Sequence, residues 1–482
     1  MDTYMYLFPY EKVPRDAKIV IYGAGAVGQE YLRQMLMTHY AEVVCFVDRA
    51  FDKYPPMALP VYAPGKIKML EYDYIVLAFR EGNFAKDVKR LLQEWNIPDE
   101  KIIFEGARNS ADVLPTGAGT TIFLDSEKLA FHHAPLSIAL KYGSGLGDAI
   151  IKKRLFMEIA KMAPEALIDI YAPGGGGDFI PLIYSDHPQF NQAIKDGGAL
   201  YATYHKEYDL AMSVFYMIQT DYLNYERIIN INPAFAEQMA QHIAGHKEYR
   251  LNNFPATQKR IHFDRAVYRG WNCYSLYNYT DVFHITDWKV SIPLNPLYEK
   301  EYKEMALPRY ISFNFGNSIT SKGNKQEANK QWPQEYFEKF IEMFHKKFPA
   351  IAVVQVGDRT TEALSGADYY VIGKDLELVK YVLKGAWFHL DIEGGLMHLA
   401  SQLGTKCVAI FGPTPVWLFG YPPNLNIDSP FCNGCYCLYD MNTYGCAKGL
   451  QRPECMWSIT PEMVMAKMEK WMEEGTVDDR IE

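Results

Sequence analysis

The sequence predicts an α/β protein built of three units, each with a parallel sheet covered by helices. Apolar runs typical of buried strands alternate with amphipathic stretches along most of the chain, and this alternation predicts parallel sheets. Two of the apolar runs lead through a glycine-rich turn into a helix, as β-α-β units commonly do. The chain has 482 residues, too many for one core, and about three domains of ordinary size would account for them.

Composition and charge exclude several classes of protein. Hydrophobic residues make up 49% of the chain, enough to offset the entropy lost on folding. The net charge of −9 is not relieved by any basic run, which argues against a nucleic-acid partner. The start of the chain lacks the pattern of a signal peptide, and no apolar run reaches the length of a bilayer span. We therefore expect a cytoplasmic protein without a transmembrane segment, at most peripheral to the inner membrane.

The first unit is predicted over residues 1–110, followed by a linker over 111–134 that is rich in small and turn-forming residues. Apolar runs and amphipathic stretches predict strands at 18–22, 42–47 and 74–78, and helices at 27–37 and 84–95.

A glycine turn in this unit has the pattern of a dinucleotide-binding fingerprint. Gly23, Gly25 and Gly28 stand between the first strand and the first helix, and Asp48 ends the next strand about twenty residues on. Glycines there allow close approach of a diphosphate to the helix N-terminus, and the acid would take ribose hydroxyls. The alternative is a glycine turn that only lets the helix pack on the strand, and both alternatives stay open.

The second unit, over 135–305, places a carboxylate on a glycine turn. The predicted elements are a strand at 136–140, a helix at 149–162, strands at 167–171 and 208–212, and a helix at 233–243. Gly145 and Gly147 flank the turn that carries Asp148. Ligands bind at this edge of open α/β sheets, so Asp148 is a candidate general base. A helix cap is the alternative role for it.

The third unit, over 306–430, is the most regular part of the sequence. The predicted strands are 310–314, 351–356, 386–390 and 407–411, and the predicted helices are 333–348, 376–383 and 397–403. Lys330 precedes the first of these helices, and a second glycine turn lies between a strand and a helix. Glycine backbone N–H groups and a lysine suit a diphosphate leaving group. The candidate donor-binding residues are Lys330, Glu393, Gly394, Gly395, His398 and Thr414.

Five of the eight cysteines crowd into a loop predicted over 431–458. In a reducing compartment such a cluster indicates a metal site before disulfides. Cys432, Cys435, Cys446 and Cys455 would supply four thiolates to one structural ion, with Cys437 as the spare, and the ligand set favours zinc. Reduced, unpaired thiols are the alternative. A closing helix is expected within 459–482, with Thr460 as its cap.

The third unit resembles the nucleotide-sugar domain of glycosyltransferase family nine, the ADP-heptose-type heptosyltransferases. Lys330-Gln-Trp332-Pro matches the family's Lys-x-Trp-Pro element, and Glu393-Gly394-Gly395-Leu-Met-His398 matches its Asp-Thr-Gly-x-x-His element. The family's Thr becomes Gly394, its Asp becomes Glu393, and the acid after Gly412-Pro-Thr414 is lost, which leaves the donor sugar open. Gly147-Asp148 corresponds to the family's Gly-Asp turn with the presumed base.

The resemblance implies a GT-B fold, in which two Rossmann-like domains face each other, here preceded by a small Rossmann-like domain similar to that of sugar acetyltransferases. It implies inverting transfer of a sugar from a nucleoside diphosphate donor, such as ADP-heptose, to a hydroxyl on a glycan, a lipid-linked acceptor or a protein. It requires no catalytic metal. The related autotransporter heptosyltransferases have a four-cysteine iron site in this loop. A homo-oligomer is also compatible with the sequence.

Two alternatives come from other functional classes. The first is an NAD-dependent sugar-nucleotide oxidoreductase or epimerase, for which the Tyr-x-x-x-Lys pair is missing after the first unit. The second is a non-catalytic nucleotide-sugar-binding protein.

Overall fold

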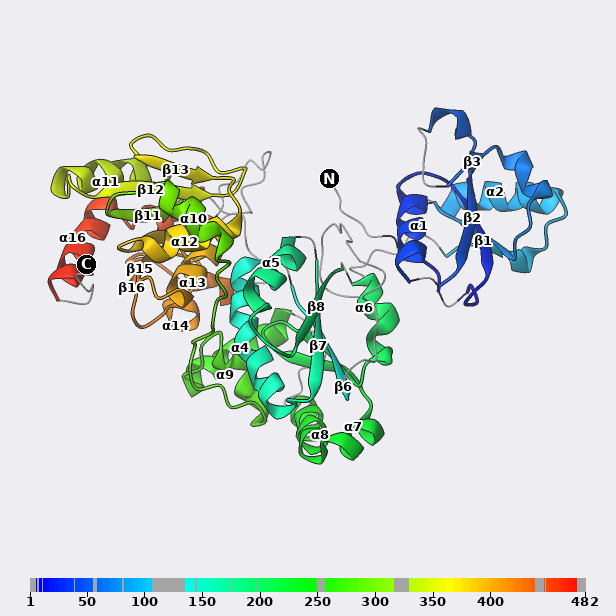
Figure 1. Ribbon diagram of the computed structural model, residues 1–482, viewed down its shortest axis with the longest axis horizontal. Helices are drawn as coiled ribbons and strands as arrows, with labels where there is room; N and C mark the ends of the chain where they lie inside the picture. The colour runs from blue at the N-terminus through cyan, green and yellow to red at the C-terminus, as the bar shows by residue number, and fades with distance from the viewer. Residues whose placement is uncertain are drawn as a thin grey trace.

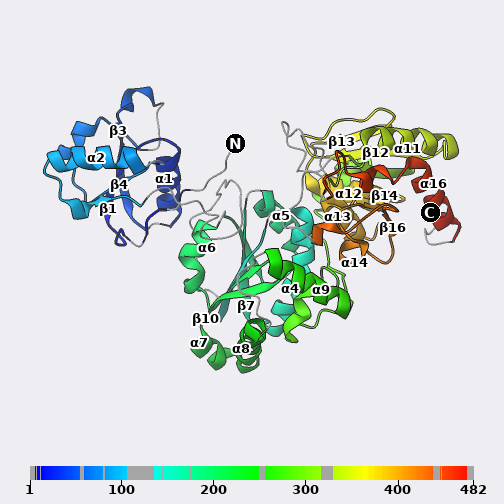
Figure 2. The same cartoon turned by 180° about the vertical axis from the view of Figure 1, so that it is seen from behind.

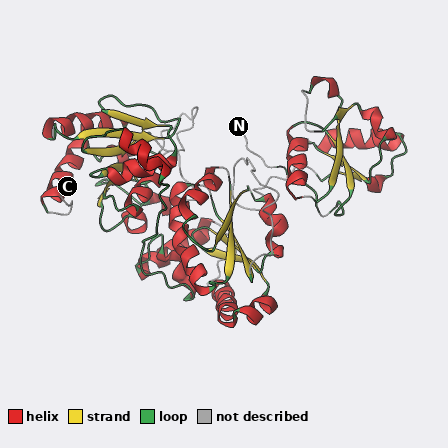
Figure 3. Ribbon diagram, viewed as in Figure 1, coloured by secondary structure: helices red, strands yellow, loops and turns green. Residues whose placement is uncertain are grey.

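The structure is a computed structural model of the 482-residue chain (Figure 1). It describes residues 6, 8–10, 12–38, 40–54, 59–79, 82–105, 135–143, 145–173, 175–196, 198–248, 256–315, 329–437, 446 and 448–474. The predicted linker at 111–134 lies outside these residues. Helices cover three separate sheets (Figure 3). None of the described helices combines the length and apolar character needed to cross a membrane.

The first unit holds a five-stranded sheet in the order β3-β2-β1-β4-β5, and its strand pairs are parallel. Its strands are β1 (Lys18–Tyr22), β2 (Glu42–Val47), β3 (Val61–Tyr62), β4 (Tyr74–Leu77) and β5 (Ile102–Ile103), and its α-helices are α1 (Ala26–Thr38) and α2 (Gly82–Glu94). The two short edge strands, which have only two residues each, were not predicted.

The second unit holds a sheet in the order β10-β9-β6-β7-β8, in which only β10 runs antiparallel to its neighbour. The strands are β6 (Leu136–Lys141), β7 (Ala166–Ala172), β8 (Phe190–Lys195), β9 (Leu210–Val214) and β10 (Ile218–Leu223). The helices are α4 (Leu146–Met162), α5 (Gly175–Tyr184), α6 (Ala199–Tyr204), α7 (Tyr225–Ile231), α8 (Pro233–Glu248) and α9 (Ala256–Arg269). Figures 1 and 2 show α6 on one side of this sheet and α4 and α9 on the other.

The third unit holds a six-stranded parallel sheet in the order β13-β12-β11-β14-β15-β16. The strands are β11 (Tyr310–Asn314), β12 (Ala352–Gly357), β13 (Tyr369–Ile372), β14 (His389–Ile392), β15 (Cys407–Phe411) and β16 (Leu425–Asp428). The helices are α10 (Leu297–Glu304), α11 (Gln334–Lys347), α12 (Leu376–Gly385), α13 (Gly395–Gln402), α14 (Val416–Phe419), α15 (Glu454–Trp457) and α16 (Pro461–Glu473).

The chain's last helix completes the core of the third unit. α16 packs beside α11, and both cover the same face of the sheet (Figure 1). Thr460 caps α16 by accepting the Met463 N–H at 3.3 Å, as predicted. Trp332 is fully buried in this core and donates from Nε1 to the Ile459 carbonyl at 2.7 Å. This hydrogen bond therefore links the segment before α11 to the segment before α16.

One hydrophobic core runs through the second unit and into the third. It includes β6 and α4 of the second unit and also α12, α13 and the adjoining face of the third sheet. Two buried lysines hold the segment that connects the units: Lys153 Nζ donates to the Ser291 carbonyl at 2.8 Å, and Lys380 Nζ donates to the Pro293 carbonyl at 2.8 Å. The second and third units are two facing Rossmann-like domains, so the predicted fold class is confirmed.

The predicted elements differ from the observed ones mainly at their ends, but the strands β8, β13 and β16 were not predicted. The helix expected at 149–162 begins at Leu146, so the predicted glycine turn is partly helical. The strand expected at 386–390 is displaced to His389–Ile392, because Ala386 ends α12 as its C-cap. In the aromatic-rich stretch of the second unit, α9 and the antiparallel β10 had no periodic signal and were not predicted.

Candidate functional site

The candidate residues lie where strand order reverses in the second and third sheets. In the second sheet β6 neighbours β9 and β7, and Asp148 follows β6. In the third sheet β11 neighbours β12 and β14, and Glu393 follows β14 directly. Such switch points open a crevice at the carboxyl ends of the strands, where ligands bind in open α/β sheets. The two switch points meet through the first turns of α4 and α13.

Asp148 lies in the first turn of α4, with its side chain half-exposed. The helix is capped at Gly145, whose φ of +127° suits glycine, so Asp148 is not the cap residue. Lys152, one turn further on and only 3% exposed, places Nζ 3.4 Å from Asp148 Oδ1. The carboxylate is thus half-exposed to solvent and has one cation beside it.

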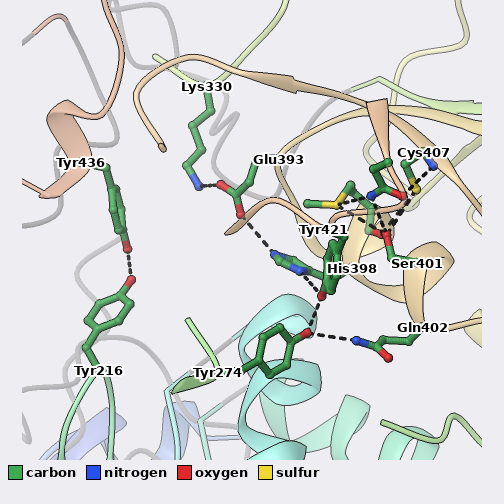
Figure 4. Close-up of polar contacts among 12 residues, drawn as sticks. Tyr216, Tyr274, Lys330, Glu393, His398, Ser401, Gln402, Cys407, Tyr421 and Tyr436 are labelled. Atoms are coloured by element: carbon green, nitrogen blue, oxygen red, sulfur yellow. Dashed lines mark hydrogen bonds and ion pairs between the residues drawn. The ribbon is translucent and has the colours of Figure 1, made fainter. Parts of the chain in front are cut away.

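Lys330, Glu393 and His398 form a continuous polar chain in the third unit (Figure 4). Lys330 Nζ donates to Glu393 Oε2 at 2.6 Å, and His398 Nε2 lies 3.3 Å from Glu393 Oε1. Burial alone would raise the pKa of Glu393, but Lys330 and His398 outweigh this effect and hold it well below its usual value. Glu393 is therefore a carboxylate at neutral pH and accepts hydrogen bonds rather than donating them.

Two tyrosines extend this chain into the second unit. Tyr421 bonds through its hydroxyl to His398 Nδ1 at 2.7 Å and also to the Tyr274 hydroxyl. Tyr274 in turn accepts a hydrogen bond from Gln402 Nε2 at 3.1 Å. His398 thus has both ring nitrogens engaged, which fixes its orientation between Glu393 and Tyr421. No periodicity or spacing in the sequence pointed to either tyrosine.

A second pair of tyrosines bridges the two units near Lys330. Tyr216 follows β9, and its hydroxyl bonds to the hydroxyl of Tyr436 from the cysteine loop (Figure 4). Burial raises the pKa of the Tyr216 phenol, and the nearby Tyr436, Asp148 and Glu393 raise it further. The Tyr216–Tyr436 pair is therefore a second hydrogen-bonded link between the second and third units.

Glycines bring the two units into direct backbone contact at this site. A Cβ atom on Gly395 would lie 2.9 Å from Leu146 Cβ, and one on Gly147 would lie 2.9 Å from His398 Cδ2. Gly394 has no such neighbour within 3.4 Å. The close packing of α4 on α13 therefore accounts for Gly147 and Gly395. Thr414 is buried in the turn between β15 and α14.

The glycine turn of the first unit is held by its own carboxylate. Asp48 Oδ2 accepts the Ala24 N–H at 2.9 Å and the Tyr54 hydroxyl at 3.0 Å, and Oδ1 accepts the Ala50 N–H at 2.9 Å. A side chain on Gly28 would collide with the Gly23 carbonyl. Gly23 and Gly28 thus have a packing role, and Gly25 has open space around it. This geometry favours the alternative in which the turn packs helix on strand.

The four predicted ligand cysteines lie near one another. Burial, and then the negative charge of Cys432, Cys435 and Cys446, raises the pKa of Cys455 to about 12. Among the described residues, however, no three side chains converge as a metal-binding group. The side chain of Cys437 lies outside the described part of the chain. The metal site therefore stays a prediction.

Comparisons with known proteins identify the third unit most directly. Residues 301–432 match the family described as glycosyltransferase family 9 (heptosyltransferase), and residues 15–103 match one described as C2185-like, N-terminal. No curated protein matches the chain.

Solved structures similar to this chain include three bacterial glycosyltransferases. ADP-heptose lps heptosyltransferase II of E. coli is 14% identical, with a TM-score of 0.45, over 70% of this chain and 99% of that one. A family 9 glycosyltransferase of Veillonella parvula is 15% identical, with a TM-score of 0.45, over 72% and 99%. The iron-containing dodecameric glycosyltransferase TibC of enterotoxigenic E. coli is 14% identical, with a TM-score of 0.45, over 70% and 78%.

Proposed function

We propose that this chain, a glycosyltransferase whose residues 301–432 form a glycosyltransferase family 9 domain, transfers a sugar with inversion from a nucleoside diphosphate to an acceptor hydroxyl. One observation carries the proposal: the turn that bears Asp148 packs directly against the turn between Glu393 and His398, since a Cβ atom on Gly147 would lie 2.9 Å from His398 Cδ2, and Lys330 is paired with Glu393. A base and a cation for the leaving group thus belong to one crevice.

The roles follow from the chemistry of these groups. Asp148 would remove the proton from the acceptor hydroxyl while its oxygen attacks the anomeric carbon. The bond from that carbon to the diphosphate breaks in the same step, and Lys330 would stabilise the negative charge left on the diphosphate. Glu393, held ionised, would accept hydrogen bonds from donor hydroxyls. A single displacement of this kind inverts the anomeric configuration.

The donor proposed first is ADP-heptose. A structure of E. coli WaaC contains ADP, and one of TibC contains ADP-D-beta-D-heptose. Gly394 replaces a Thr of the family motif and leaves more room beside the donor, so a related sugar is the second candidate. The acceptor proposed is a hydroxyl on a glycan, a lipid-linked saccharide or a protein.

One structural iron or zinc ion is proposed for the cysteine loop. The support is the donor set, since four cysteines gather in a loop whose described residues include two glycines and form no strand. Because TibC is described as dodecameric, a homo-oligomer is proposed as well. No step of the transfer depends on this ion.

A ligand screen followed by an activity assay tests the function. Thermal shift with a panel of ADP-, UDP-, GDP- and CDP-sugars should single out one base, because a ligand that binds only the folded state raises its stability. Release of the nucleoside diphosphate in the presence of acceptor extracts then measures transfer. A folded protein that binds no nucleotide sugar would overturn the proposal.

A further inference from the structure

Tyr436, in the first part of the cysteine loop, contacts residues of the transfer site. It stands beside Cys435 in the sequence, and its ring lies over the Lys330 ammonium, with 5.3 Å from Nζ to the ring centroid. Figure 4 shows its hydroxyl directed at Tyr216, away from the Lys330–Glu393 pair. One side chain therefore touches both the cation of the third unit and a residue of the second unit.

The backbone around Tyr436 is attached to the turn that follows β15. The Tyr436 N–H donates to the Pro413 carbonyl at 2.9 Å, and the Gly434 N–H donates to the Gly412 carbonyl at 3.3 Å. Gly434 has a φ of +73°, which suits glycine and turns the chain toward this contact. The Phe419 ring meets the Tyr436 ring edge to face, 6.1 Å between centroids. The loop is thus fastened to the donor side of the crevice by backbone and ring contacts.

The partner of Tyr436 is itself held in a defined place. The Phe215 carbonyl, next to Tyr216, accepts a hydrogen bond from the Tyr277 hydroxyl at 2.6 Å, and the Tyr216 carbonyl lies 3.0 Å from His262 Nε2. These contacts fix the turn between β9 and β10. The Tyr216 hydroxyl therefore has a fixed position in the second unit, and its hydrogen bond to Tyr436 depends on how the second and third units are placed.

Resting on the proposed function, we propose that Tyr436 is a positioning residue of the transfer site. Its ring keeps Lys330 aligned for the diphosphate, its hydroxyl holds the second unit closed on the donor, and the cysteine cluster holds Tyr436 in place. A cation over an aromatic ring is attracted by the ring face. The two parts of the side chain thus act on different steps, donor binding and transfer.

Two substitutions at Tyr436 separate these parts. Tyr436→Phe keeps the ring, so donor affinity should stay near that of the unaltered protein, while kcat falls about fivefold, the effect of one lost hydrogen bond. Tyr436→Leu removes the ring as well, and Kd for the nucleoside diphosphate should rise about tenfold. Tyr171→Phe is the matched control, because it also removes one tyrosine hydroxyl from a hydroxyl pair. That pair, Tyr171 with Tyr208, is buried within the second unit.

The coupling to the cysteines has its own test. Cys432→Ser should raise Kd for the nucleoside diphosphate as Tyr436→Leu does, whereas Cys45→Ser, in the core of the first unit, should not. Isothermal titration of the full-length protein with ADP, UDP, GDP and CDP gives Kd, and nucleotide release gives kcat. Normal binding by both Tyr436→Leu and Cys432→Ser would overturn the inference.

The failure of this inference is distinguishable from failure of the proposed function. If unaltered protein binds one nucleotide and Lys330→Ala weakens that binding, while the Tyr436 variants behave like Tyr171→Phe, only the inference falls. If folded, unaltered protein binds none of the four nucleotides, the proposed function falls and the inference falls with it.

Discussion

Lys330 Nζ lies 2.6 Å from Glu393 Oε2, and the carboxylate that it meets is only 7% exposed. The two side chains come from opposite sides of the switch point, 63 residues apart in the sequence. The pair keeps Glu393 ionised inside the protein, and it leaves the lysine partly exposed to receive a second anion. The lysine therefore has a structural partner and a proposed substrate partner.

Lys330→Ala should weaken nucleotide binding and also destabilise the protein. The substitution leaves Glu393 buried with only His398 beside it, and loss of one partner of a buried pair costs about 3 kcal/mol. Denaturant unfolding and nucleotide titration measure the two effects. Lys374→Ala, at an exposed lysine of the same unit, is the control. If the two variants have the same free energy of unfolding and the same nucleotide affinity, Lys330 is an ordinary surface residue.

Asp148→Asn should leave donor binding intact and reduce transfer by about two orders of magnitude or more, the usual contribution of a general base. Asp178→Asn is a close control, because Asp178 also lies in the first turn of a helix of the second unit, α5, and is similarly exposed. Nucleotide titration and initial rates measure the two quantities. Transfer by Asp148→Asn at the rate of the control variant would remove Asp148 from the mechanism.

Gly395→Ala should lower the melting temperature without removing any chemical group from the site. The added Cβ would lie 2.9 Å from Leu146 Cβ, and overpacking of this kind costs about 1–3 kcal/mol. Gly394→Ala is the control, since its nearest neighbour would be 3.7 Å away. Calorimetry of the two variants checks the result. A larger drop in melting temperature for Gly394→Ala than for Gly395→Ala would mean that α4 and α13 are not closely packed.

Because His242 is buried, the free energy of unfolding should decrease as the pH falls from 6.5 to 4. Burial, and then His246, lowers its pKa from 6.5 to about 4, so in this window only the unfolded state takes up the proton. The stability that comes from keeping His242 neutral is fully present above pH 6.5 and is lost as the pH falls toward 4. Urea unfolding should show a smaller pH slope in His242→Asn than in the unaltered protein. His284→Asn, at an exposed histidine, is the control variant.

Purified protein should contain about one equivalent of iron or zinc, and replacing Cys432, Cys435, Cys446 or Cys455 by Ser should release it. Cys407→Ser, in the buried strand β15, should retain the ion. Elemental analysis decides between these outcomes. Folded, active protein without metal would mean that the four thiols have another role.

The sequence predicted the parallel sheets because their strands are buried on both faces and read as continuous apolar runs. β1, β2, β11 and β15 have the predicted bounds. The antiparallel β10 was missed because its partly exposed residues show no such run. Of the candidate site, the glycine turns and charged residues stood out in the sequence. The structure packs the turn that carries Asp148 against the turn between Glu393 and His398.

The tyrosines of the site could not be predicted. Tyr216, Tyr274, Tyr421 and Tyr436 come from four separate segments, and their roles depend on which hydroxyls the fold brings together. In a chain with 35 tyrosines, residue type alone carries little information. The first glycine turn shows the opposite case: its sequence has the pattern of a nucleotide site, but in the structure the Asp48 carboxylate accepts a hydrogen bond from the backbone of the turn itself.

The late position of α16 in the chain sets an order of events during synthesis. The described strands of the first unit are complete by Ile103, so this unit can fold while the ribosome is still translating the second. The third unit lacks Met465, Met468 and Trp471 until α16 has been translated, so its phenylalanine-rich face stays uncovered until then. During that interval the nascent chain presents an apolar surface that a chaperone can bind, and release of the C-terminal helix ends the exposure.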